Sequence, residues 1–381
     1  MPDHSTKPPF ETKPFNTSLD AQVAAGAGLY EEISREITQP VPPALKAFAQ
    51  GIVEVFPKPP VGVLFYGSLA RPQAPGPSAG AAADPALDPS GVLDFYVVVE
   101  STDGLLGSAL ERKAARVLPP NVYYWEEPHS AFEARTFGNP AAQPLRAKVA
   151  VITVDDFRAR CRPSSLDTTL WARFSQPCRL VWAPSETAAA SVASLLCEAV
   201  LTAAWWAFIL PTPSQAQQWF SAQDWAAFWR NLYAHTYKAE LRVEGADRSA
   251  SLLAGQVGRY GHMLLLAWMA LGLLHEGKLS TPAPEQRQAA LEQWGHIMRA
   301  GKVLNGSRLL KALFTFRGGV DYILWKIHRH TGQVIPASDF ERNHPLLGLP
   351  RLLWRLRHIP FMHKNTGAQG HGGQKTPPGA N

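Results

Sequence analysis

The sequence predicts an α+β protein, with a sheet in its first half and helices in its second. Short apolar runs of strand-forming residues lie before residue 155, and Ala-, Leu- and Trp-rich stretches with helical periodicity follow from about residue 187. With 381 residues, 46% of them hydrophobic, the chain can bury a large core. The composition therefore excludes disorder throughout, and the absence of a fixed repeat excludes collagen-like and coiled-coil folds.

Residues 1–40 predict a mobile segment that contains one short helix. Residues 1–20 are rich in Pro, Thr and Lys, and an amphipathic stretch at 29–37 stops before Pro40. The first residues show no apolar stretch typical of a signal peptide. The 3 cysteines form no CxxC pair, which favours a reducing compartment. We therefore expect a cytoplasmic protein.

Residues 41–186 predict a first domain built on a sheet. Its strand candidates are residues 61–66, 92–100, 122–125 and 148–154. Between the first two, the Pro-, Gly- and Ala-rich residues 71–91 predict a flexible loop.

Residues 187–300 predict a helical domain. Its helix candidates are residues 187–210, 223–236, 250–275 and 285–303. The longest apolar runs, at 199–210 and 263–274, are shorter than the roughly 20 residues that cross a bilayer, so we expect core helices there. Residues 301–362 predict a basic helical C-terminal region, and residues 363–381 a disordered tail.

A Gly-Ser turn follows the first strand candidate and an acid lies within the second. Tyr66-Gly67-Ser68 and Asp94 together have the outline of a nucleotidyltransferase site. Glycine permits close backbone approach to a triphosphate, the Ser68 hydroxyl and free N–H groups bind phosphate, and a carboxylate holds Mg²⁺. The alternative is an ordinary turn followed by a strand that contains an acid. Burial of an unpaired acid among apolar neighbours is costly, which favours the site.

The second metal carboxylate of such sites is missing from its usual place. The common Asp-x-Asp pair reads Asp94-Phe95-Tyr96 here, so a second carboxylate must come from elsewhere. Glu126-Glu127 is the best-placed source and Asp155-Asp156 is the next, with surface acids as the alternative for both pairs.

Six blocks in order carry a family resemblance. FYGS, LDFYVVV, NVYYWEE, LRAKVAVITVDDF, LDTTLWARFSQPCRLVW and LYAHTYKAELR resemble the mitochondrial-type phosphatidate cytidylyltransferases, the translocator assembly and maintenance proteins. The matching positions are Tyr66, Gly67, Ser68, Asp94, Val122, Tyr123, Tyr124, Lys148, Val151, Asp167, Trp171, Arg179, Tyr237, Glu240 and Arg242.

The resemblance implies a polymerase-beta-like nucleotidyltransferase domain with a mixed sheet, followed by a helical domain. It also implies synthesis of CDP-diacylglycerol and pyrophosphate from CTP and phosphatidic acid, with Mg²⁺ on Asp94. Tyr66, Gly67, Ser68 and Lys148 would bind the nucleotide, and Asp94, Lys148 and Arg179 would be catalytic. The other matched positions with an implied role are Asp167, Trp171, Tyr237, Glu240 and Arg242.

Departures from the family pattern leave two alternatives open. They lie at Leu69, Val149-Ala150, Pro177-Cys178, Trp182 and Ala239-Glu240. One alternative is a related nucleotidyltransferase with a different nucleotide or acceptor. The other, indicated by the missing second Asp of the pair, is a non-catalytic protein that keeps the fold as a membrane-bound scaffold.

The basic charge gathers at the C-terminus. Residues 301–381 contain 12 Lys and Arg against 3 acids, a net charge of +9, whereas the whole chain carries +6. Within them, residues 349–361 place leucines at helical spacing on one side, Arg351, Arg355 and His358 on the other side, and Trp354 at the seam. Arg357 is a further cation of this stretch. This pattern predicts a helix on the surface of an anionic membrane, peripheral on the inner face of the cell membrane.

The alternative for this C-terminal helix is an amphipathic helix packed on the helical domain. We expect no nucleic-acid partner, since the basic region lacks the interleaved aromatic and Gly pattern of RNA-binding modules.

Overall fold

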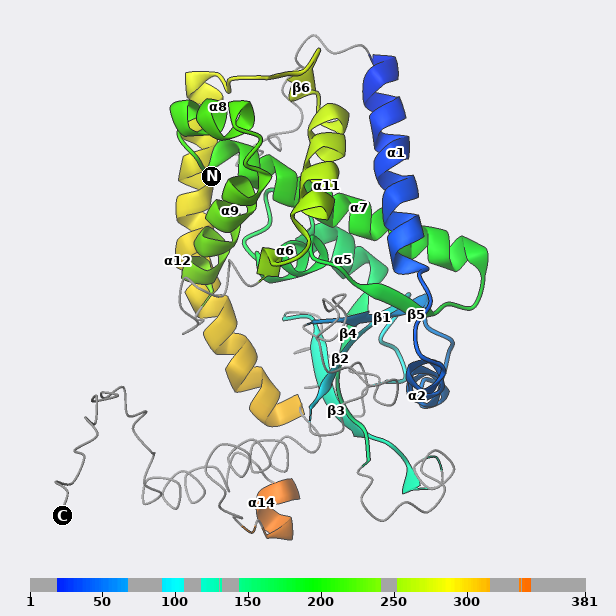
Figure 1. The fold of residues 1–381 in the computed structure, drawn as a ribbon. Helices are drawn as coiled ribbons and strands as arrows, with labels where there is room; N and C mark the ends of the chain where they lie inside the picture. The colour runs from blue at the N-terminus through cyan, green and yellow to red at the C-terminus, as the bar shows by residue number, and fades with distance from the viewer. Residues whose placement is uncertain are drawn as a thin grey trace, which may run out of the picture. The chain divides into compact units, whose positions relative to one another are not determined.

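The computed structural model describes residues 19–67, 91–105, 118–129, 131, 144–240, 252–315, 336 and 338–343 (Figure 1). The chain divides into two compact units, residues 1–317 and 318–381. In the second unit, the described part contains helix α14 (Asp339–Asn343).

The first unit contains a five-stranded mixed sheet with the strand order β3-β4-β2-β1-β5. Its strands are β1 (Gly62–Tyr66), β2 (Leu93–Val99), β3 (Asn121–Glu126), β4 (Arg146–Thr153) and β5 (Arg179–Trp182). Strands β2 and β4 are parallel, and the other neighbours are antiparallel. The predicted α+β class is confirmed, with strands at all four predicted places. Strand β5 was not predicted.

Most of the other described residues of this unit are helical, and most of the helices lie on one side of the sheet (Figure 1). They are α1 (Leu19–Ile37), α2 (Pro43–Glu54), α5 (Val154–Arg160), α6 (Thr169–Phe174), α7 (Glu186–Ile209), α8 (Pro213–Ser221), α9 (Trp225–Ala239), α11 (Val257–Ala270) and α12 (Pro284–Thr315). A two-residue pair, β6 (Leu274–His275) with β7 (Lys278–Leu279), follows α11. Helices α7, α9, α11 and α12 occupy the four predicted helical stretches of the second half.

Each face of the sheet packs against different helices, because side chains alternate along a strand. On one face, Phe65 and Phe95 belong to a core that includes Phe48 of α2. On the other, Leu64 and Tyr96 belong to a larger core that continues into the helices that follow the sheet in sequence. The predicted sheet and helical regions therefore share one continuous core.

The N-terminal helix is longer than the sequence indicated. It spans 19 residues, and Leu29, Ile33 and Ile37 are buried in the helical core. Helix α1 lies beside α11 and also contacts α7 (Figure 1). Its apolar residues recur every four positions, so one stripe of the helix faces the core. Residues 19–37 are thus part of the packed unit.

Helix α7 lies at the centre of the helical region. In the part of the chain that the structure describes, it is the one helix long and apolar enough to cross a membrane, but 78% of its apolar window is buried inside the protein. A helix that is apolar all round suits a core position of this kind.

Candidate active site

A pocket opens between the sheet and the helices, where β1 ends and β2 begins. The residues that line it come from β1, β2, α6, α9 and the adjoining loops. They are Tyr66, Gly67, Asp94, Thr169, Ala172, Arg173, Gln176, Pro177, Tyr233, Thr236, Tyr237, Glu240 and Leu252. Five of the residues that the family resemblance singles out therefore line one cavity: Tyr66, Gly67, Asp94, Tyr237 and Glu240.

Strand pairing brings the first part of the site together. Tyr66 at the end of β1 lies opposite Asp94 on β2, and Lys148 lies beside Asp94 on β4. Residues paired across neighbouring strands share a face of the sheet, so all three side chains extend from the face opposite α2, where Tyr66 belongs to the larger core. The Tyr66 hydroxyl donates to Asp94 Oδ1 at 3.5 Å.

Gly67 is needed at the turn that follows β1. Its φ of 98° lies in the left-handed region that L side chains disfavour. A Cβ at this position would lie 3.1 Å from Asp94 Oδ2. The glycine therefore lets the carboxylate approach the backbone closely.

The charge on Asp94 is poorly stabilised by the protein alone. Burial raises the pKa of this carboxyl above its ordinary value, although Lys148, Arg173 and the hydrogen bond from Tyr66 oppose the shift. A cation that entered the pocket would favour the charged carboxylate.

This environment fits Mg²⁺ bound partly by substrate. In proteins Mg²⁺ often uses one or two carboxylates together with substrate phosphates. Asp94 supplies one such carboxylate, and the described residues contain no group of three His, Cys, Asp or Glu that could hold a metal by themselves. A metal here would therefore take other ligands from groups that the protein cluster does not supply, such as phosphate oxygens and water.

Glu240 provides the second carboxylate of the pocket. It follows the last residue of α9, is 6% exposed, and accepts a hydrogen bond from Thr168 Oγ1 at 3.0 Å. The sequence matched Glu240 to the family but did not place it in the same pocket as Asp94, because more than 140 residues separate the two along the chain.

The acids proposed as a second carboxylate lie elsewhere. Glu126 pairs with Arg146 at 3.5 Å, and Glu127 Oε2 accepts from the backbone N–H of Leu145 at 3.1 Å. Asp155 and Asp156 begin α5, beyond the end of β4 that is distant from Lys148. Thr153, the last residue of β4, lies five residues beyond Lys148, a distance of about 17 Å along an extended strand. Neither acidic pair lines the Asp94 pocket.

Arg179 also lies away from the pocket. It pairs with Phe65, whose side chain packs in the core on the α2 face, and so it extends from the opposite face to Asp94. Its guanidinium donates to Gln39 Oε1 at 2.8 Å and to the carbonyl of Cys178 at 3.0 Å. The predicted role of Arg179 at the reacting phosphates is therefore not supported by its position.

Arg173 lies where Arg179 was expected. This residue of α6 lines the pocket, and its guanidinium carbon lies 4.9 Å from the centre of the Tyr66 ring. Its Nη1 donates to the Tyr66 hydroxyl at 3.4 Å. The sequence signal was an arginine within the apolar block TLWARF, where the neighbours Ala172 and Phe174 are buried.

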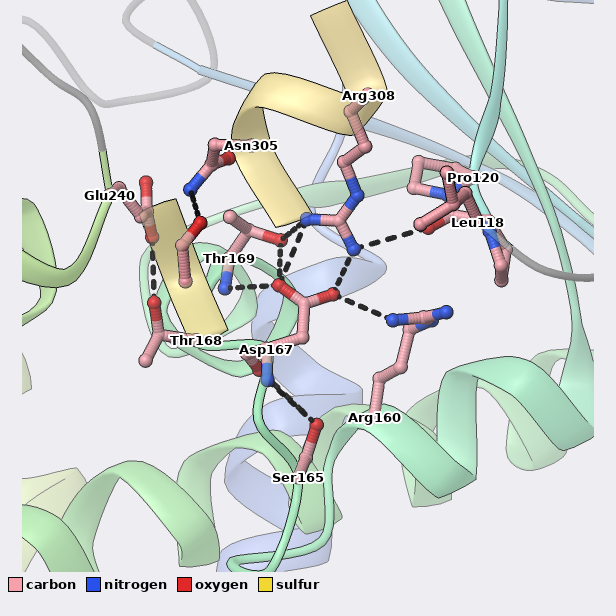
Figure 2. Close-up of polar contacts among 12 residues, drawn as sticks. Leu118, Pro120, Arg160, Ser165, Asp167, Thr168, Thr169, Glu240, Asn305 and Arg308 are labelled. Carbon is pink, nitrogen blue, oxygen red and sulfur yellow. Dashed lines mark hydrogen bonds and ion pairs between the residues drawn. The ribbon is translucent and has the colours of Figure 1, made fainter. Parts of the chain in front are cut away.

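Asp167 lies behind the pocket wall (Figure 2). Its carboxylate accepts from Arg160 at 2.9 Å, from Arg308 Nη1 at 3.0 Å and from the Thr169 hydroxyl at 2.6 Å. Burial alone would raise the pKa of Asp167, but the hydrogen bonds and charges of Arg308 and Arg160 lower it to about 2. Asp167 thus holds Thr169, which lines the pocket, without lining it itself.

The other predicted residues fall into two groups. Trp171 of α6 is 0% exposed and belongs to the larger core, so its role is in packing. Ser68 and Arg242 lie outside the described residues, as do residues 71–90 of the predicted loop and the predicted membrane residues Arg351, Trp354, Arg355 and Arg357.

Comparison with known proteins does not assign the chain to a family. No protein-family model matches the chain, and no curated protein matches it.

Proposed function

We propose that this pocket transfers the cytidylyl group of CTP to phosphatidic acid, which would yield CDP-diacylglycerol and pyrophosphate. One observation carries the proposal: Tyr66, Asp94 and Glu240, which the resemblance matches in distant blocks, line a single pocket with Gly67 at its edge. A nucleotidyltransferase needs this combination of an open backbone turn and carboxylates.

In this proposal the Gly67 turn binds the triphosphate and Asp94 holds Mg²⁺. When bound, Mg²⁺ would neutralise part of the negative charge of the phosphates. Lys148, which interacts electrostatically with Asp94, would add positive charge beside the phosphates. Glu240 would form the opposite wall, at the end of α9.

The transfer itself needs little acid–base chemistry from the protein. A phosphate oxygen of phosphatidic acid would attack the α-phosphorus of CTP, and the bond to the departing pyrophosphate would break. The acceptor phosphate is already ionised at neutral pH, so no strong general base is required. Positioning two anions and offsetting their repulsion are the main tasks of the pocket.

The proposed setting is a membrane surface on the cytoplasmic side. The support is the amphipathic pattern of residues 349–361 and the charge of +9 over residues 301–381. A diacyl substrate leaves a bilayer only at high free-energy cost, which is consistent with an enzyme that works at the surface.

A transfer assay tests the proposed function. Purified protein is incubated with radiolabelled CTP, Mg²⁺ and phosphatidic acid vesicles, and the label is then separated into lipid and aqueous phases. We expect label in the lipid phase for the wild type and none for Asp94→Asn. Parallel reactions with the other nucleoside triphosphates and with glycerol 3-phosphate test the alternative nucleotide and acceptor. Absence of product in every reaction would contradict an enzymatic role.

A further inference from the structure

Arg173 differs in its contacts from two other mostly buried arginines of the described residues, Arg259 and Arg308. Its guanidinium lies over the rings of Tyr66, at 4.9 Å, and Tyr96, at 5.9 Å. Its hydrogen bond within the described residues is the 3.4 Å contact with the neutral Tyr66 hydroxyl. A guanidinium has five N–H donors, so most of its donor capacity is not used by described protein groups.

Arg259 and Arg308 show how the same fold satisfies an arginine when its role is structural. Arg259 donates to both carboxylate oxygens of Glu36 and, at 3.1 Å, to the carbonyl of Ser175. Arg308 contacts both oxygens of Asp167 and the carbonyl of Pro119. Among the described residues, Arg173 forms no ion pair of this kind.

Arg173 nevertheless keeps its charge. Burial opposes the charged form, but Tyr66 and Tyr96, together with the carboxylates of Asp94 and Glu240, raise the pKa of Arg173 above its ordinary value. The pocket therefore contains a permanent cation next to the carboxylate assigned to Mg²⁺ and next to the Gly67 turn.

We infer that Arg173 binds a phosphoryl group of a substrate in this pocket. The inference rests on the proposed function and names the residue that takes the role expected of Arg179. The planar fork of a guanidinium matches two phosphoryl oxygens at once. A phosphoryl group at this point would also give Arg173 a negative partner in direct contact, which it does not have among the described residues.

Binding measurements with five proteins test the inference. The proteins are the wild type, Arg173→Met, Arg173→Lys, Arg179→Met and the control Arg230→Met, which changes an exposed arginine of α9 that pairs with Asp224. The ligands are CTP, inorganic pyrophosphate and dihexanoyl phosphatidic acid, each titrated calorimetrically with Mg²⁺ present. Thermal unfolding of each variant checks that it is folded.

We expect Arg173→Met to lower the affinity for at least one phosphoryl ligand by about ten- to a hundred-fold, the usual range for a lost charged hydrogen bond. Arg173→Lys should keep part of the affinity because it keeps the charge, and Arg230→Met should bind like the wild type. Loss of CTP and pyrophosphate affinity would identify the nucleotide phosphates as the group bound. Loss of phosphatidic acid affinity alone would identify the acceptor phosphate.

Two results would overturn the inference. One is a folded Arg173→Met protein that binds all three ligands like the wild type, and the other is a loss of affinity in Arg179→Met instead. Pyrophosphate binding that depends on Arg173, in a protein that does not bind CTP, would support the phosphoryl site and refute the cytidylyl proposal.

A measurement on the wild type needs no variant. Phenylglyoxal modifies accessible arginines, and mass spectrometry locates the modified residues. Saturating CTP or pyrophosphate should protect Arg173 and leave Arg230 reactive. Equal modification of Arg173 with and without saturating ligand would overturn the inference. This result would count even if Arg173→Met and Arg173→Lys failed to fold.

Discussion

At the scale of single residues, Gly67 links the backbone of the turn to the position of Asp94. Its φ of 98° is unfavourable for an L side chain, and a Cβ at this position would lie only 3.1 Å from Asp94 Oδ2. The consequence is local strain and displacement of the carboxylate in any variant that adds a side chain.

Gly67→Ala is therefore expected to destabilise the protein by about 1–2 kcal/mol, the usual cost of a left-handed L residue. It should also weaken Mg²⁺-dependent CTP binding. Urea unfolding and CTP titration measure the two effects. Gly306→Ala in α12 is the matched control, since a Cβ there meets nothing within 4 Å. CTP binding by Gly67→Ala equal to that of the wild type would refute the role of this turn.

Arg179 and Arg173 illustrate what the sequence could and could not predict. The strand candidates were found because apolar runs of this length suit buried strands. Which face a side chain takes depends on pairing register, and β5 joins β1 with an irregularity between Val63 and Leu64. A shift of one residue moves every side chain to the other face, so the sequence alone could not place Arg179.

At the scale of elements, helix α12 connects the helical core to the edge of the sheet. Trp294 and Ile297 pack in the helical core, whereas Lys311 donates to the carbonyl of Leu118 at 2.7 Å and to Asn121 Oδ1 at 2.6 Å. Arg308, one turn earlier, binds Asp167 behind the pocket wall (Figure 2). The sequence predicted this helix only to residue 303, so these contacts lay beyond the predicted element.

Removal of the Arg308 charge should therefore destabilise the fold and disturb the pocket. Arg308→Met leaves the buried Asp167 carboxylate without one of its two cations, and we expect a loss of about 3 kcal/mol. Arg299→Met, at an exposed position of the same helix that contacts His296, should change stability by less than about 0.5 kcal/mol. Urea unfolding at pH 7 measures both. Equal stabilities of the two variants would contradict the role of α12 in holding Asp167.

The same ion pair predicts a pH dependence of stability. The pKa of Asp167 is lowered from 3.8 to about 2, so the unfolded chain binds the proton more readily than the native protein does. The stabilisation, on the order of 2 kcal/mol, is complete above about pH 4 and is lost as the pH falls toward about 2. Asp167→Asn should reduce the difference between the free energies of unfolding at pH 5 and pH 3. An unchanged difference would refute this assignment.

At the scale of the whole molecule, the proposed site and the proposed membrane contact belong to different parts of the chain. The residues that line the pocket lie between Tyr66 and Leu252, and the basic amphipathic stretch is residues 349–361. Changes in one are therefore expected to leave the other in place.

Removal of residues 349–381, or replacement of Arg351, Arg355 and Arg357 by Glu, should weaken binding to anionic vesicles. Each surface cation lost is worth roughly 1 kcal/mol, and the effect should shrink at high salt because screening already removes part of the attraction. CTP binding should persist in both variants. Vesicle co-sedimentation and nucleotide titration on the same preparations measure both effects. Undiminished sedimentation of the triple Glu variant would indicate that this stretch packs internally.

The most direct test of the nucleotide site is calorimetric titration of CTP into the wild type and Asp94→Asn, each with and without Mg²⁺. Asn keeps the volume of Asp but removes the charge that Mg²⁺ requires. We predict that the wild type binds CTP in a Mg²⁺-dependent manner, and that Asp94→Asn loses the Mg²⁺-dependent part while it unfolds at a temperature close to that of the wild type. CTP binding that is identical in the two proteins, or absent from the wild type, would contradict a nucleotidyltransferase site at Asp94.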